Sequence, residues 1–202
     1  MPRPTRAILG ATLLAALALT GCSSSSKPAS VTIPFKSSAV VDNRLSARYT
    51  CDGKNVSPPL EWGKVPSTTK ELALFMLALR PIPGTSGYRP TVLWGMAGVN
   101  PALHRLAAGE TPPGAHLALT KAGKRTVYSV CPPKNNAITY QFALYAVPSS
   151  LTIPARFVGI SLLQLIANPE SSDQSDVGGA FAATYRRRAS HGAVRHAAGT
   201  QG

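Results

Sequence analysis

Three cysteines carry the clearest chemistry in this chain of 202 residues: Cys22, Cys51 and Cys131. A thiol can be acylated, can pair in a disulfide, or can ligate zinc. Zinc sites need further Cys or His residues at close spacing, and neither Cys51 nor Cys131 has such a neighbour. We therefore expect no metal and no other cofactor, which leaves acylation and disulfide formation.

Cys22 lies directly after an apolar run over residues 7–19, which Arg3 and Arg6 precede. The run is too short to span a bilayer and has the length of a signal-peptide core. It ends in Leu-Thr-Gly-Cys, which resembles the bacterial lipobox, where the cysteine is diacylated and the leader is cut just before it. We expect residues 1–21 to be a lipoprotein signal peptide. The alternatives are an ordinary secretory signal and an uncleaved anchor.

This interpretation places the mature chain on the extracytoplasmic face of a bacterial cell membrane, held there by lipid on Cys22. The serine-rich residues that follow cannot pack, so residues 22–32 are interpreted as the lipidated cysteine and a flexible tether. The folded domain is expected over residues 33–188, and a disordered basic tail over residues 189–202.

Export leaves Cys51 and Cys131 in an oxidising compartment, where an even number of remaining thiols favours a disulfide. Each lies in a proline-bearing segment: YTCDGKNVSPPLEW over residues 49–62 and YSVCPP over residues 128–133. A bridge across about 80 residues stabilises a fold by about 4 to 5 kcal/mol in the chain-entropy model. The alternative is two buried thiols that do not meet.

Most of the secondary-structure elements that must hold these two segments are predicted to be strands. Unbroken apolar runs predict strands buried on both faces, and alternation predicts strands with two different faces. Helical spacing of apolar residues and Pro154 predict one helix over residues 156–167. These elements indicate an antiparallel sandwich. The predicted strands are residues 31–35, 72–79, 91–99, 138–147 and 177–185.

The formal net charge of +13 is the unusual bulk property of the chain. Nucleic-acid binding would need basic residues gathered in one element with interleaved aromatics. Here they are scattered, with one cluster at residues 186–188. We expect no nucleic-acid partner and interpret the charge as a solvated surface near anionic envelope lipid.

The two proline-bearing segments, with GGAFAATYRR at residues 178–187, resemble the bacterial phosphatidylethanolamine-binding protein (PEBP) family, the Raf-kinase-inhibitor-like group. The likeness runs from about residue 33 to residue 188. It implies a mainly β fold, an antiparallel Greek-key β-sandwich with a helix near the carboxyl end. It also implies a small surface pocket for anions such as phosphate or a phospholipid headgroup.

Such a pocket uses acidic residues after the first long core strand, a histidine before a tryptophan, and the segment around the proline pair. In this chain Arg80 stands near the place of the acids, and Leu93 precedes Trp94. A second expected histidine, ahead of the late strand, is replaced by Ile138 or Thr139. The resemblance therefore implies a pocket without its usual ionic groups. Its candidate residues are Arg80, Leu93, Trp94, Tyr128, Pro132 and Pro133, none of them catalytic.

These features predict a membrane-anchored binding module with a degenerate anion pocket rather than an enzyme. Its expected partner is an anionic lipid or an envelope protein, and an inhibitory role is the more specific version. Arg80 either holds an anion alone or is a surface arginine at a strand end. Two other functions remain as alternatives. One is a small envelope hydrolase with an unrecognised site, and the other is a carrier of an apolar ligand in a deep cavity between the sheets.

Overall fold

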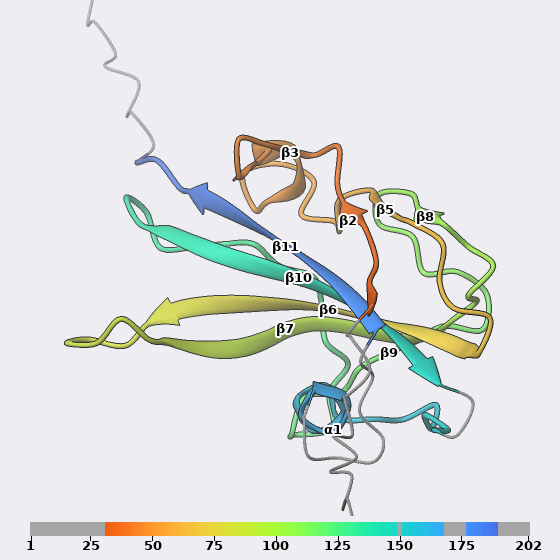
Figure 1. The fold of residues 1–202 in the computed structure, drawn as a ribbon. Helices are drawn as coiled ribbons and strands as arrows, with labels where there is room; N and C mark the ends of the chain where they lie inside the picture. Colours follow the sequence, from red (N-terminus) through yellow and green to blue (C-terminus); the bar gives the residue numbers. More distant parts are fainter. Residues whose placement is uncertain (1–30, 149–150, 168–176, 190–202) are drawn as a thin grey trace, which may run out of the picture.

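The computed structural model describes residues 31–148, 151–167 and 177–189 (Figure 1). Cys22, the expected leader, most of the expected tether and the tail after Ala189 lie outside these residues, so those interpretations stay predictions. The first described strand begins at Val31, inside the range assigned to the tether. Among the described helices, none has the length and apolar character needed to cross a membrane.

The larger of the two sheets contains the long strands of the described chain: β6 (Thr69–Pro81), β7 (Tyr88–Val99), β10 (Ala137–Pro148) and β11 (Val177–Arg186). They lie in the order β11-β10-β6-β7, each antiparallel to its neighbours. Two-residue strands complete the sheet, namely β1 (Val31–Thr32), β3 (Val40–Val41), β4 (Arg44–Leu45) and β9 (His116–Leu117). Both β1 and β4 pair with β11 in parallel.

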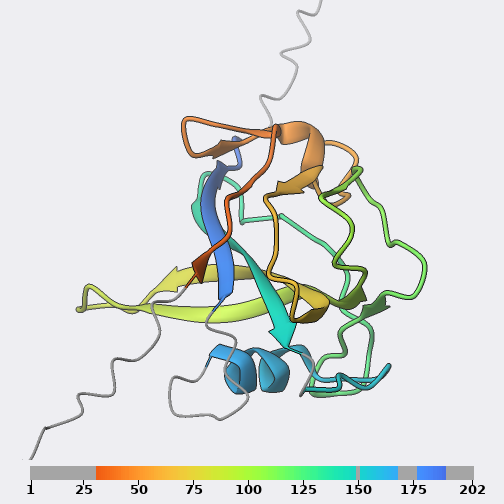
Figure 2. The ribbon, with the colours of Figure 1, turned by 45° about the vertical axis from the view of Figure 1, so that its right-hand side comes forward.

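The smaller sheet consists of β2 (Phe35–Lys36), β5 (Leu60–Trp62) and β8 (Arg105–Leu106), paired antiparallel in that order. It covers one face of the larger sheet, and α1 (Gly159–Ala167) covers the other face (Figure 2). A short 3-10 helix, η1 (Ala47–Tyr49), lies just before Cys51. The described residues are therefore mainly β, with two packed sheets and one helix near the carboxyl end, as the sequence predicts.

The unbroken apolar run in β6 is explained by burial on both of its faces. Leu72, Leu74 and Met76 pack between the sheets, whereas Phe75 and Leu77 pack under α1. Successive side chains of a strand point to opposite faces, so a strand with two covered faces needs apolar residues at every position. The aligned residues of β10 supply the neighbouring part of both cores.

Two predicted elements differ from the structure. The expected strand over residues 31–35 is divided at Ile33 and Pro34, because β1 pairs with β11 in the larger sheet while β2 pairs with β5 in the smaller one. Pro34 has no N–H to donate, which suits a point where the chain changes sheets. The helix begins at Gly159 rather than Arg156, because backbone hydrogen bonds tie Phe157 and Gly159 to Leu119.

Candidate functional site

The disulfide joins Cys51 to Cys131, with a Cα–Cα distance of 5.3 Å. The backbone N–H of Cys51 donates to the carbonyl of Val130 at 3.1 Å, so the two segments also meet through the main chain. The bridge therefore fastens the turn after η1 to the loop before β10, which lie 80 residues apart in the sequence.

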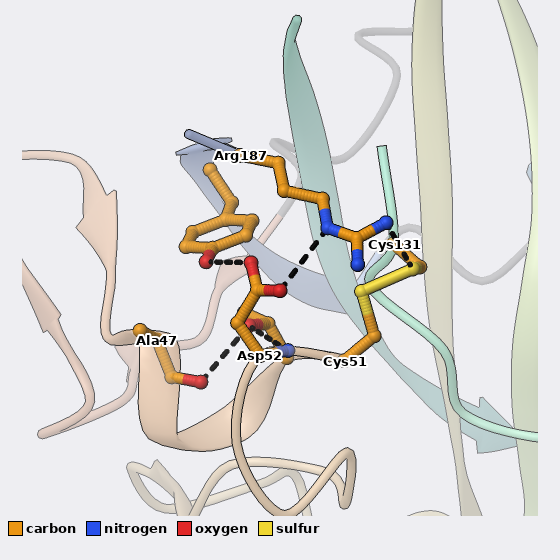
Figure 3. Close-up of a disulfide and its surroundings, with 7 residues drawn as sticks. Ala47, Cys51, Asp52, Cys131 and Arg187 are labelled. Atoms are coloured by element: carbon orange, nitrogen blue, oxygen red, sulfur yellow. Dashed lines mark hydrogen bonds and ion pairs between the residues drawn. A yellow bond between two sulfur atoms is a disulfide. The ribbon is translucent and has the colours of Figure 1, made fainter. Parts of the chain in front are cut away.

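Asp52 links this bridge to the end of β11 (Figure 3). The Tyr185 hydroxyl donates to its Oδ2 at 2.6 Å, and Arg187 Nε donates to its Oδ1 at 3.1 Å. A second nitrogen of Arg187 lies 3.4 Å from the Cys131 sulfur. The hydrogen bond from Tyr185, followed by that from Arg187, holds the pKa of Asp52 below its ordinary value of 3.8, although partial desolvation opposes them.

The Asp52→Asn variant is expected to be less stable than the unaltered protein at neutral pH and equally stable in strong acid. The folded-state pKa of Asp52 is depressed, so its contribution is complete above the unfolded-state pKa and disappears as pH falls through the folded-state pKa. Urea unfolding between neutral pH and about pH 2 measures this difference. Asp42→Asn removes the same charge from the β3–β4 turn and serves as control. A difference that persists unchanged into acid would contradict the assignment.

A cavity of about 200 Å³ lies beside Trp94 and is called here the Trp94 cavity. Trp94 comes from β7, and its ring meets Tyr128 edge to face, with centroids 6.4 Å apart. The buried Thr126 hydroxyl accepts a hydrogen bond from Gly95 N and holds the Tyr128 segment against β7. The remaining walls are residues 55–57 after the disulfide, residues 109–111 of the long connection, Leu117 and Val127.

Two buried polar atoms of the lining residues have no hydrogen-bond partner among the described residues: the Tyr128 hydroxyl and Asn55 Oδ1. Leaving a buried polar atom without a hydrogen bond lowers the stability of a fold by about 1 to 3 kcal/mol. Burial raises the pKa of Tyr128, so the phenol stays neutral at physiological pH. Glu110 is the charged residue of the lining, and no lining residue is basic. The lining residues therefore carry two unpartnered hydrogen-bonding atoms, both shielded from solvent, and one acidic side chain.

The structure brings only some of the predicted pocket residues together. Trp94 and Tyr128 line the Trp94 cavity, whereas Arg80, Leu93, Pro132 and Pro133 do not. Leu93 is the half-buried extra residue at an irregular step in the β6–β7 pairing, and it packs against the core between the sheets.

Arg80 is exposed near the end of β6, opposite Arg89 of β7. Its guanidinium lowers the pKa of Tyr140, but desolvation is the larger effect and raises that pKa to about 12. Pro132 is buried and Pro133 is exposed, both next to the disulfide.

Sequence reasoning missed Asn55, Ser57 and Glu110 as cavity residues. Asn55 has a positive φ of 49°, a conformation that asparagine adopts more readily than most residues, and this could have marked a shaped turn in the YTCDGKNVSPPLEW segment. Ser57 is buried, and its hydroxyl accepts from Gly109 N at 3.2 Å, which joins this turn to the long connection. Nothing in the sequence around Glu110 indicates the contact.

Comparison with known proteins gives one consistent family. A family model described as "Phosphatidylethanolamine-binding protein" matches residues 36–193. The putative lipoprotein LppC of Mycobacterium tuberculosis is 31% identical over 135 residues, which cover 66% of this chain and 64% of LppC. A UPF0098 protein of Methanothermobacter thermautotrophicus is 32% identical over 112 residues, which cover 54% of this chain and 72% of that protein. This chain therefore spans somewhat less than two thirds of its LppC relative.

Solved structures agree on the fold. The crystal structure of a putative PEBP homologue, CT736 from Chlamydia trachomatis, matches with a TM-score of 0.61 and 24% identity, over 77% of this chain and 98% of that chain. YbcL of E. coli matches with a TM-score of 0.60 and 20% identity, over 77% of this chain and 99% of that chain. At this identity the likeness describes the architecture of the sheets.

Proposed function

Because this chain belongs to the phosphatidylethanolamine-binding protein family, we propose that it is a lipid-anchored binding module of the bacterial cell envelope whose Trp94 cavity takes a small hydrogen-bond donor. The donor is an amine or a hydroxyl compound rather than an anion. The observation that carries this proposal is the pair of unpartnered polar atoms on Tyr128 and Asn55, two residues that line one cavity. Binding is also the role named in the family's description.

The charges around the cavity favour a cation or a neutral donor over an anion. A phosphate placed there would lie near Glu110 with no basic lining residue to offset its charge. An ammonium group would instead meet the Glu110 carboxylate and the rings of Trp94 and Tyr128, which attract cations over their faces. Once these two side chains turn toward the cavity, a ligand hydroxyl would donate to Asn55 Oδ1 and pair with the Tyr128 hydroxyl.

The volume of the cavity limits the size of its ligand. About 200 Å³ corresponds to the space of about six to seven water molecules, which suits a headgroup-sized compound but not an acyl chain. Large buried side chains such as Leu74, Met96 and Phe142 fill the space between the sheets. This packing disfavours the alternative of an apolar-ligand carrier.

Titration of a variant with one tryptophan tests the ligand class. The chain has two tryptophans, and Trp62→Phe leaves Trp94 as the fluorescent reporter of the cavity. We expect ethanolamine or glycerol to change Trp94 emission in a saturable manner and inorganic phosphate to have no such effect. Glu110→Gln is expected to weaken the response to ethanolamine and to preserve that to glycerol. A saturable response to phosphate alone would contradict the proposal.

The Tyr128→Phe variant is expected to leave the free energy of unfolding unchanged or to raise it by up to about 1 kcal/mol, because the deleted hydroxyl lacks a partner. The same variant is expected to weaken the ligand response of Trp94. Urea unfolding and the fluorescence titration measure the two effects. Tyr88→Phe changes an exposed tyrosine near the β6–β7 turn and is the matched control. Strong destabilisation by Tyr128→Phe would show that the hydroxyl already has a partner.

The membrane anchor has a separate test. LppC is named a putative lipoprotein, and Cys22 of this chain occupies a lipobox-like position. Cys22→Ala is expected to move the protein from the membrane into the soluble envelope fraction after cell fractionation. Retention on the membrane would count against lipidation at Cys22.

An inhibitory action on an envelope protein is a narrower form of the same binding role.

A further inference from the structure

A second hollow, larger than the Trp94 cavity, lies where β11 ends and is called here the β11 groove. Its volume is about 1010 Å³. One wall is the β3–β4 hairpin with Ala47, and the other is residues 184–189 at the end of β11. Asp52, Lys134 and Ala137 complete the lining. Figure 3 shows Asp52 and Arg187 beside the disulfide at this place. None of these residues lines the Trp94 cavity.

Basic side chains dominate the β11 groove. Five basic residues line it, against the two acidic residues Asp42 and Asp52. The basic residues come from three separate segments: Arg44 from β4, Lys134 from the loop after the disulfide, and the consecutive arginines 186–188 from the end of β11. The fold therefore gathers positive charge that the sequence shows only in part.

Arg44 and Arg188 have no acidic partner in the described part of the chain, and both are exposed. By contrast, Asp52 holds Arg187, and Arg186 donates to the carbonyl of Asn135 at 3.1 Å. A guanidinium presents a planar fork of N–H donors that fits the oxygens of an oxyanion in pairs. Arg44 and Arg188 thus line the groove with their donor capacity available.

We propose that the β11 groove is a binding site for phosphate esters, independent of the Trp94 cavity. A terminal phosphate offers three acceptor oxygens and up to about two negative charges, so it can meet donors from several directions at once. A carboxylate offers two oxygens and one charge. The arrangement of cations on three segments therefore suits phosphate better. The phosphate group belongs either to a lipid headgroup or to a free ester.

Asp52 limits the affinity of this site. Its carboxylate neutralises Arg187 and places a negative charge on the groove wall. An incoming phosphate therefore relies on the basic residues other than Arg187, chiefly the exposed Arg44 and Arg188. Removing the charge of Asp52 would release the guanidinium of Arg187 toward the same ligand, so this variant and the arginine variants have opposite expected effects.

Calorimetric titration of the full chain in detergent micelles tests the site with three phosphate probes that carry no glycerol group: inorganic phosphate, the monoester methyl phosphate and the diester dimethyl phosphate. Acetate is the carboxylate control. We expect saturable binding of the phosphate probes and none of acetate. Preference for the diester would identify a lipid headgroup as the source, and preference for inorganic phosphate or the monoester would identify a free phosphate compound.

The Arg44→Gln/Arg188→Gln double variant is expected to weaken phosphate binding by about tenfold or more. Lys121→Gln/Lys124→Gln removes two exposed charges elsewhere and is expected to change it little. Asp52→Asn is expected to strengthen binding several-fold. Absence of saturable binding, or equal losses in both double variants, would overturn the proposal. Tighter binding of a polyglutamate peptide than of any phosphate probe would also overturn it, in favour of an acidic protein. The Trp94 fluorescence titration is a separate measurement, so failure of this proposal can be told apart from failure of the proposed function.

Discussion

Replacing both Cys51 and Cys131 by alanine is expected to lower the free energy of unfolding by about 4 to 5 kcal/mol. The bridge closes a sequence separation of 80 residues, which restricts the unfolded chain far more than a short loop would. Cys131 is exposed and Cys51 is half-buried, so little of the effect should come from a cavity left behind. Urea unfolding of the oxidised proteins measures the change.

Two comparisons separate the bridge from other effects of losing thiols. Cys22→Ala removes a cysteine outside the bridge and is expected to leave the unfolding free energy unchanged. Treating the unaltered protein with a reductant is expected to give nearly the same loss as the double variant. If the double variant and the reduced protein were both as stable as the oxidised protein, the disulfide would not constrain the fold.

The Gly179→Ala variant is expected to lose about 3 kcal/mol of stability, a large change for one methyl group. Gly179 lies in β11, next to the residues that connect β1 to β2. A Cβ added at Gly179 would overlap the carbonyl oxygen of Ile33. It would also lie 2.8 Å from Phe35 Cβ, closer than carbon atoms tolerate. Backbone cannot move aside there without disturbing the pairing of both sheets.

Gly87→Ala is the matched control for this change. Gly87 lies between β6 and β7, and an added Cβ would meet only side-chain atoms, the nearest being Thr85 Oγ1 at 3.4 Å. We expect its unfolding free energy to stay within about 0.5 kcal/mol of the unaltered protein. Equal stabilities of the two variants would show that β11 has room beside Gly179.

The long strands and the disulfide pairing could be predicted from the sequence because each depends on a local or countable signal. Alternation in residues 138–147 indicates the two faces of β10, and the apolar run in β6 indicates burial on both sides. With Cys22 assigned to acylation, the two remaining thiols allow one pairing, and the structure contains it. The change of sheets between β1 and β2 has no comparable signal, since both short strands continue one alternating pattern.

The candidate site was only partly predictable for a related reason. Trp94 and Tyr128 were expected to lie together, and the structure places them edge to face. Asn55 and Glu110 reach the same cavity through turns whose packing depends on the disulfide and on the long connection. Periodicity describes strands and helices but not the way in which turns pack. Arg80 was expected near these residues, yet β6 extends past the cavity and leaves it exposed.

The parallel pairing of β1 with β11 places the first described residues of the chain at the start of β11. Val31 pairs with Val177 at the start of β11, whereas the consecutive arginines 186–188 lie at its other end (Figure 1). The nine steps from Val177 to Arg186, at about 3.3 Å each, place these points about 30 Å apart. A chain held to a bilayer through its amino-terminal side would therefore have these arginines at the end of β11 that is remote from the point of attachment.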